Sequence, residues 1–185
     1  MALTHTLDIH RRNTFSIGLM IALASWALVF MTLVWGYVVL RMRTSIWLGE
    51  YLPPVVWSLA ALNTTIIALS SLALHWGLRE RTFRSPSLIW AAFLLGIIFL
   101  LGQLQLWQSI MHHGLNWRGS IAGSFFFLLT GFHALHIAGA LLAVFILGVR
   151  FQAVQGSSFA IGVKYFWDFL FVVWVVIFGL IFFIQ

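Results

Sequence analysis

The chain of 185 residues contains no cysteine and very few charged residues. The absence of cysteine excludes disulfides, thiolate-bound copper and iron–sulfur clusters. Charged side chains make up 8% of the chain, whereas a soluble domain carries about 25%. Only four residues are acidic, and only Asp168 falls within a hydrophobic segment. A di-iron bundle needs carboxylates from several helices, so the sequence excludes that class of site.

Hydrophobic residues are abundant instead, at 62% of the chain with a mean hydropathy of +1.03. Five segments are long enough to cross about 30 Å of hydrocarbon as helices, which rise 1.5 Å per residue. We therefore predict an all-α membrane protein, a bundle of five transmembrane helices in a single integral membrane domain covering residues 1–185. The predicted spans are 15–40, 54–77, 87–110, 121–149 and 162–184.

The basic residues predict the direction in which the chain crosses the membrane. Of the ten lysines and arginines, seven fall on the side of the N-terminus and three on the other side. The positive-inside rule then places the N-terminus in the cytoplasm and the C-terminus outside. The net charge of +6 is spread over short loops, which favours contact with anionic lipid headgroups and gives no indication of nucleic-acid binding.

The segment GSFFFLLTGFHALHIAG, at residues 123–139, places two histidines in the middle of the fourth span. His133 and His136 are three residues apart, so they share a helical face with Thr130. An imidazole in hydrocarbon needs a hydrogen-bond partner, and we expect both rings to be packed and hydrogen-bonded. A metal or proton-transfer role is the alternative. The other histidines lie at different depths, which argues against a bis-histidine haem.

Asp168 is the one carboxylate expected inside the membrane, about two turns from the cytoplasmic end of the last span. Lys164 precedes it by four residues, so the two can form an ion pair on one helical face. His75 and Arg150 approach the same side of the membrane. A structural pair is expected here, with a proton relay as the alternative. No serine or threonine within the spans has a base adjacent in sequence, so we expect no catalytic residue.

The sequence also indicates how particular side chains pack. Gly131 and Gly139 flank the two histidines and offer a small surface suited to close helix contact. Five tryptophans near the ends of the spans are expected to lie at the membrane interfaces; they are Trp47, Trp57, Trp107, Trp117 and Trp167.

The segment with the two histidines resembles the signature G-S-x-F-F-x-x-T-G-F-H-x-x-H of subunit III of the haem–copper oxidases. Further motifs follow in the order typical of that family, so the resemblance covers nearly the whole chain. These motifs are Leu62-Asn63-Thr64 with Ser70-Ser71 and His75, Leu101-Gly102-Gln103 with Trp107, Arg150, Tyr165-Phe166-Trp167 and Val172-Val173-Trp174. The chain looks like the five-span bacterial form of the family.

The resemblance implies a non-catalytic subunit of an aerobic terminal oxidase in the bacterial plasma membrane. Such a complex passes electrons from cytochrome c, or from quinol, to oxygen and translocates protons. Subunit I would be the main contact, subunit II a second one, and haem and copper would reside in these partners, with neither metal nor catalytic residues in this chain. The expected role is stabilisation of the catalytic subunit and binding of phospholipids. The lipid-binding or structural residues would be His75, His133, His136 and Arg150.

Two other functions remain open at this point. An accessory subunit of a nitric oxide reductase system shares the five-span pattern. A small membrane transporter would show discontinuous helices or an inverted repeat, and the sequence shows neither.

The sequence departs from the family pattern at positions that usually carry acids. Trp26 stands where the family usually has a membrane-embedded glutamate, and Leu106 stands where a second glutamate is common. In the last span, Asp168 takes the place of a usual histidine and Phe171 that of a usual aspartate. The loss of three acids argues against proton transfer through this subunit.

Overall fold

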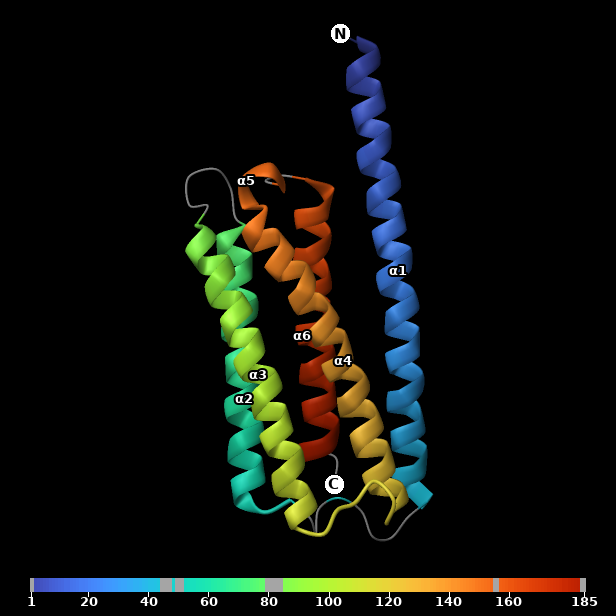
Figure 1. The fold of residues 1–185 in the computed structure, drawn as a ribbon. Helices are drawn as coiled ribbons and strands as arrows, with labels where there is room; N and C mark the ends of the chain where they lie inside the picture. Colours follow the sequence, from blue (N-terminus) through green and yellow to red (C-terminus); the bar gives the residue numbers. More distant parts are fainter. Residues whose placement is uncertain (1, 44–47, 49–51, 79–84, 155–156, 184–185) are drawn as a thin grey trace.

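The computed structural model describes residues 2–43, 48, 52–78, 85–154 and 157–183. These residues form helices and contain no strand. The helices are α1 (Ala2–Arg43), α2 (Pro54–Gly77), α3 (Pro86–His112), α4 (Ile121–Val149), the one-turn α5 (Phe151–Val154) and α6 (Ser158–Phe183) (Figure 1). All except α5 contain a segment long and apolar enough to cross a membrane. The prediction of an all-α protein with five spans is confirmed.

The ends of the helices follow from their terminal residues. Pro54 and Pro86 stand at the first positions of α2 and α3, where the missing N–H removes no helical hydrogen bond. Ser120 caps α4, because its Oγ accepts from the backbone N–H of Gly123 at 3.0 Å. Gly114 has φ 94° between α3 and α4, a left-handed conformation that favours glycine. These signals make α2 and α4 coincide with the predicted spans.

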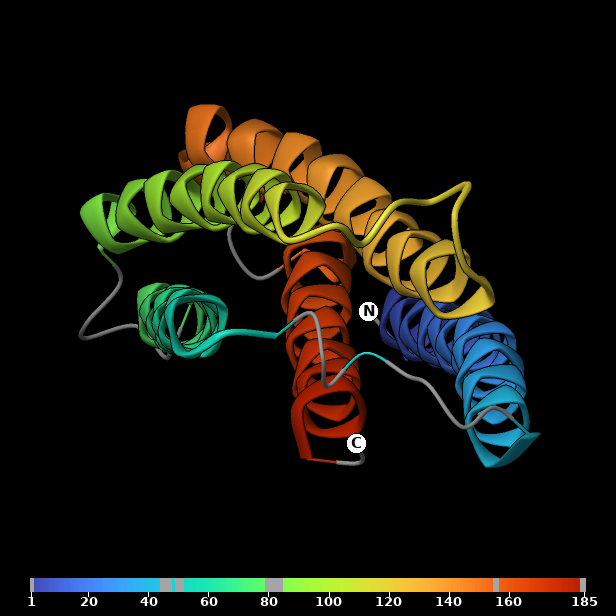
Figure 2. The same cartoon turned by 90° about the horizontal axis from the view of Figure 1, so that it is seen from below.

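The helices pack as a curved layer with α6 on its inner side. Seen along the bundle in Figure 2, α3 and α4 lie next to each other, α2 flanks α3, and α1 flanks α4. The contact of α2 with α3 is the most extensive, and α6 packs against α2, α4 and α1. The long helix α1 packs chiefly against α4 and α6, so most of its surface within the membrane is exposed.

The centre of the bundle is filled by large aromatic and aliphatic side chains. Trp167 and Trp174 of α6 are both 1% exposed. The ring of Trp167 lies against Gly96 of α3, where an added Cβ would approach the ring to 2.8 Å. Trp167 is therefore a core residue, and its indole does not face lipid as an interfacial anchor would. Trp47 lies outside the described residues.

The two glycines that flank the histidines of α4 are not closely packed. Gly139 of α4 has no atom near its missing Cβ, and Gly131 meets only the ring of Trp107, at 3.8 Å. By contrast, a Cβ on Gly77 would meet Leu88 at 3.1 Å, and a Cβ on Gly102 would overlap the amide oxygen of Asn63. Gly131 and Gly139 therefore do not provide the expected close-packing surface, whereas Gly148 of the same helix does approach α3, with its missing Cβ 3.2 Å from the ring of Trp90.

Candidate functional site

His133 lies in the core, where the inner faces of α3, α4 and α6 meet. Its side chain is 1% exposed. The imidazole stacks on Trp174 with ring centroids 5.4 Å apart and 28° between the planes, and the edge of Phe99 approaches at 6.2 Å. Neither ring nitrogen has a hydrogen-bond partner. The expectation of a hydrogen-bonded ring is wrong for His133, because aromatic side chains occupy the positions that a polar partner would need.

His136 lies one turn further along α4, on the side toward α1. Its Nδ1 is 2.6 Å from the carbonyl oxygen of Phe132. A carbonyl only accepts, so Nδ1 carries the proton and Nε2 of the neutral ring is an acceptor. The rings of Trp26 and Phe30 from α1 stand edge-on to the imidazole, with centroids 4.4 and 5.4 Å away. The two histidines therefore belong to different contacts. His133 packs in the core, and His136 packs between α4 and α1.

Two tryptophan–threonine hydrogen bonds tie the same region together. Trp107 of α3 donates from Nε1 to Oγ1 of Thr130 on α4, at 3.1 Å. Trp174 of α6 donates to Oγ1 of Thr64 on α2, at 3.0 Å. Each threonine hydroxyl donates in turn to a carbonyl of its own helix. The hydroxyls thus supply acceptors for indole groups that would otherwise be unsatisfied in hydrocarbon.

Asp168 of α6 bonds to α2. Its Oδ1 accepts from Oγ of Ser71 at 2.7 Å, and its Oδ2 is 4.0 Å from Nδ1 of His75. Lys164 instead places its ammonium 5.8 Å from the centre of the Tyr165 ring. Within the described residues the carboxylate of Asp168 therefore contacts Ser71 and His75, and the expected ion pair with Lys164 is not formed.

Arg150 follows directly after α4, at the end of the bundle where α5 lies. Its side chain is exposed and borders a hollow of about 450 Å³ between the start of α3 and the turn into α5. The hollow is lined by Pro86, Gly148, Val149, Arg150, Phe151, Gln152 and Ala153. The guanidinium has no hydrogen-bond or ion-pair partner among the described residues. It is available to an anion approaching this end of the bundle.

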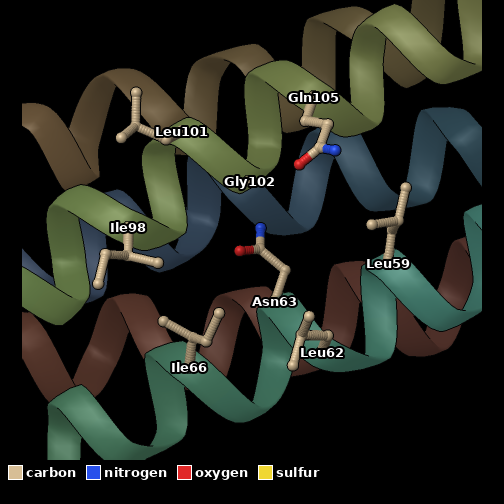
Figure 3. A pocket seen from close by; sticks show the side chains of 8 residues that line it. All are labelled: Leu59, Leu62, Asn63, Ile66, Ile98, Leu101, Gly102 and Gln105. Carbon is tan, nitrogen blue, oxygen red and sulfur yellow. The ribbon is translucent and has the colours of Figure 1, made fainter.

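Two buried amides were not identified as site residues from the sequence. Asn63 of α2 and Gln103 of α3 are each 1% exposed, and neither has a hydrogen-bond partner for its amide oxygen or nitrogen. Asn63 points across to Gly102 of α3 (Figure 3). Their presence in hydrophobic spans is visible in the sequence, but which face of the helix each occupies follows only from the packing.

The described part of the chain contains no group of three or more histidine, aspartate or glutamate side chains that could hold a metal ion. The titratable groups are separated as well: His133 and His136 lie within α4, whereas Asp168 and His75 form their own contact between α2 and α6. The arrangement offers helix-to-helix contacts and, at the end of α4, the exposed guanidinium of Arg150.

Comparison with known proteins extends over the whole length of the chain. The family model for cytochrome c oxidase subunit III matches residues 2–185. A probable cytochrome c oxidase subunit 3 of Mycobacterium tuberculosis is 32% identical, with 96% of this chain and 92% of the relative covered. Cytochrome c oxidase subunit 3 of Corynebacterium diphtheriae is 37% identical over 68% of this chain and 65% of the relative. That of Synechocystis is 30% identical over 89% and 73%.

Proposed function

We infer the role of the molecule from one premise: the chain belongs to the cytochrome c oxidase subunit III family. It is a multi-pass membrane protein and an accessory subunit of a respiratory terminal oxidase, in a complex with other oxidase subunits. We propose that it packs mainly against subunit I, contacts subunit II, and stabilises the catalytic subunit during turnover. Haem and copper would be held by those partners, in a bacterial plasma membrane, with cytochrome c or quinol as electron donor to the complex.

The exposed guanidinium of Arg150 carries the second half of the proposal, which is phospholipid binding. Arg150 borders a hollow of about 450 Å³ whose other lining residues are uncharged. Guanidinium groups bind phosphate oxygens through paired N–H donors. The position of Arg150 directly after a membrane-spanning helix suits a lipid headgroup, and the apolar lining residues Pro86, Val149 and Phe151 suit the upper part of its acyl chains.

The four residues predicted as lipid-binding or structural then divide into two kinds. We propose that Arg150 binds lipid. His133 and His136 act structurally, because one lies in the core and the other is covered by rings of α1. His75 is a structural partner of Asp168 between α2 and α6.

The lipid proposal is tested in the purified oxidase complex with Arg150→Ala. We expect the variant to lose one tightly bound phospholipid by native mass spectrometry, with subunit content unchanged. Two control variants show whether lipid loss is caused by removal of the Arg150 charge or by a change in the shape of the hollow. Gln152→Ala alters the same hollow without removing charge, and Arg118→Ala removes a cation that lies over Trp117, 5.0 Å from its ring centre. Unchanged lipid content in Arg150→Ala would contradict the proposal.

The stabilising role is tested by removing the subunit. Oxidase purified from a strain without this chain should keep its haem spectrum and its initial activity. It should lose activity during sustained turnover several-fold faster than the complete complex. Equal rates of inactivation with and without the chain would contradict a stabilising role, and loss of haem on removal would show that the chain takes part in cofactor retention.

A further inference from the structure

A groove runs between α2 and α3 on the outer surface of the bundle. It encloses about 230 Å³ and is lined by Leu59, Leu62, Asn63, Ile66, Ile98, Leu101, Gly102 and Gln105 (Figure 3). Leu62 and Leu101 are 58% and 59% exposed. For comparison, a cavity of about 150 Å³ accommodates a benzene ring. The groove is therefore large enough for one bulky side chain or a ring of similar size.

Gly102 and Asn63 lie together at the bottom of the groove. Asn63 rises from α2 directly against this glycine, and any Cβ there would overlap the amide oxygen. The amide of Asn63 is fully covered, so it forms the floor of the groove and does not reach an occupant.

Gln105 is the polar group that an occupant would meet. Its side chain is exposed and its amide lies along the rim of the groove (Figure 3). No hydrogen-bond partner for it exists among the described residues. Gln105 is seven residues before His112, the last residue of α3, which corresponds to about 10 Å of helix. Lipid chains at that depth offer neither donor nor acceptor, so an amide facing them costs free energy.

The position of Gln105 along α3 favours a transmembrane helix over a phospholipid as the occupant of the groove. A phospholipid presents its polar groups at the membrane surface, so it would fill the groove with an acyl chain and leave the amide unsatisfied. A transmembrane helix can place an amide or hydroxyl at any depth, and interhelical hydrogen bonds of this kind hold helices together in membranes. The same helix can fill the groove with a neighbouring bulky side chain.

We propose that the α2–α3 groove is the seat of a transmembrane helix from another subunit of the oxidase. That helix carries a hydrogen-bonding side chain opposite Gln105 and a large apolar side chain that enters the groove above Gly102. This inference rests on the proposed packing against a catalytic subunit and names the surface that makes the contact.

Photo-crosslinking in the intact complex tests the location. A photoreactive residue placed at Leu101 should form a covalent product with one partner subunit, and the same residue at Leu62 should reach the same partner. Placed at Leu135 on α4, 68% exposed and outside the groove, it should not reach that partner through the same segment. Labelling of lipid alone from both Leu101 and Leu62 would overturn the proposal in favour of a lipid groove.

A matched pair of variants tests the hydrogen bond. Gln105→Leu should reduce retention of this chain during detergent purification several-fold, whereas Gln108→Leu should leave retention unchanged. Gln108 is an exposed amide one turn further along α3 that does not line the groove. Equal retention of the two variants would overturn the role of Gln105. If the complex stays stabilised by the chain while both crosslinks reach only lipid, the proposed function stands and this assignment of the surface fails.

Discussion

The imidazole of His133 stacks on the indole of Trp174, with ring centroids 5.4 Å apart and 28° between the planes. Both side chains are 1% exposed, and the two ring nitrogens of His133 have no hydrogen-bond partner. Trp174 is also held by the hydrogen bond from its Nε1 to Thr64 of α2. The ring stack therefore joins α4 to α6 by aromatic contact, and the hydrogen bond of Trp174 joins α6 to α2.

This geometry predicts opposite effects for two substitutions of His133. His133→Phe keeps the stack and removes two unsatisfied polar atoms, which cost about 1–3 kcal/mol when buried. We expect unchanged or higher thermal stability of the subunit in the purified complex. His133→Ala leaves a cavity and should destabilise the subunit by about 3 kcal/mol. Haem content should be the same in both variants, and loss of haem in His133→Phe would point to a role beyond packing.

The contact between Gly102 and Asn63 predicts that a side chain at position 102 destabilises the bundle and that shortening Asn63 restores its stability. In Gly102→Ala the new Cβ overlaps the amide oxygen of Asn63, so α2 and α3 must separate, at a cost of about 1–3 kcal/mol. Adding Asn63→Ala should restore most of that loss, because coupled neighbours are not additive. Gly139→Ala is the control, since its Cβ meets open space and alanine favours helix. The stability of Gly102→Ala, of the double variant and of Gly139→Ala is measured by heating the complex and recording the temperature at which this subunit is released.

The partners of Asp168 predict which of its neighbours contributes to stability. Ser71→Ala removes a hydrogen bond of 2.7 Å to the carboxylate, and we expect a loss of about 1 kcal/mol because Asp168 is partly exposed. Lys164→Gln should have little effect on the same thermal midpoint, since the ammonium lies over Tyr165. A larger loss in Lys164→Gln than in Ser71→Ala would restore the ion pair that the sequence spacing suggests.

The sequence predicted the number of spans and, for α2 and α4, their ends, because hydrophobic runs bounded by proline, serine and charged residues determine these features. It did not predict which face of each span is buried. Nearly every position in these spans is apolar, so periodicity carries little signal about orientation. Trp167 illustrates this: its place near a span end suggested an interface anchor, whereas the packing of α3 against α6 buries it over Gly96.

For the candidate site as well, the sequence identified the residues but not the side chains that they contact. His133, His136, Asp168 and Arg150 stand out in the sequence because polar groups are rare in the spans. Arg150 has no partner among the described residues, and the other three contact helices far apart in the chain, as Asp168 contacts Ser71 across 97 positions. Spacing within one helix favoured Lys164. The sequence placed His75 on the same side of the membrane, but only the packing of α2 on α6 identifies His75 and Ser71 as the neighbours of Asp168.

The contact of Trp26 with His136 predicts how the chain tolerates an acid at a position where its family usually has one. The two ring centroids are 4.4 Å apart, and Nδ1 of His136 already donates to Phe132, so Nε2 is the nitrogen left to bond a new partner. In Trp26→Glu, a protonated carboxyl can donate to Nε2, or the carboxylate can pair with an imidazolium. We expect this variant to assemble into the complex with a modest loss of thermal stability.

The double variant Trp26→Glu with His136→Phe removes that partner and leaves a carboxyl facing apolar side chains in hydrocarbon. A buried polar group without a hydrogen bond costs about 1–3 kcal/mol, so the double variant should be less stable than the sum of the two single changes. His136→Phe alone keeps an aromatic ring beside Trp26 and Phe30 and should be close to neutral. Additive effects in this cycle would mean that Glu at position 26 never reaches His136, and that Trp26 fills the α1–α4 contact independently of the histidine.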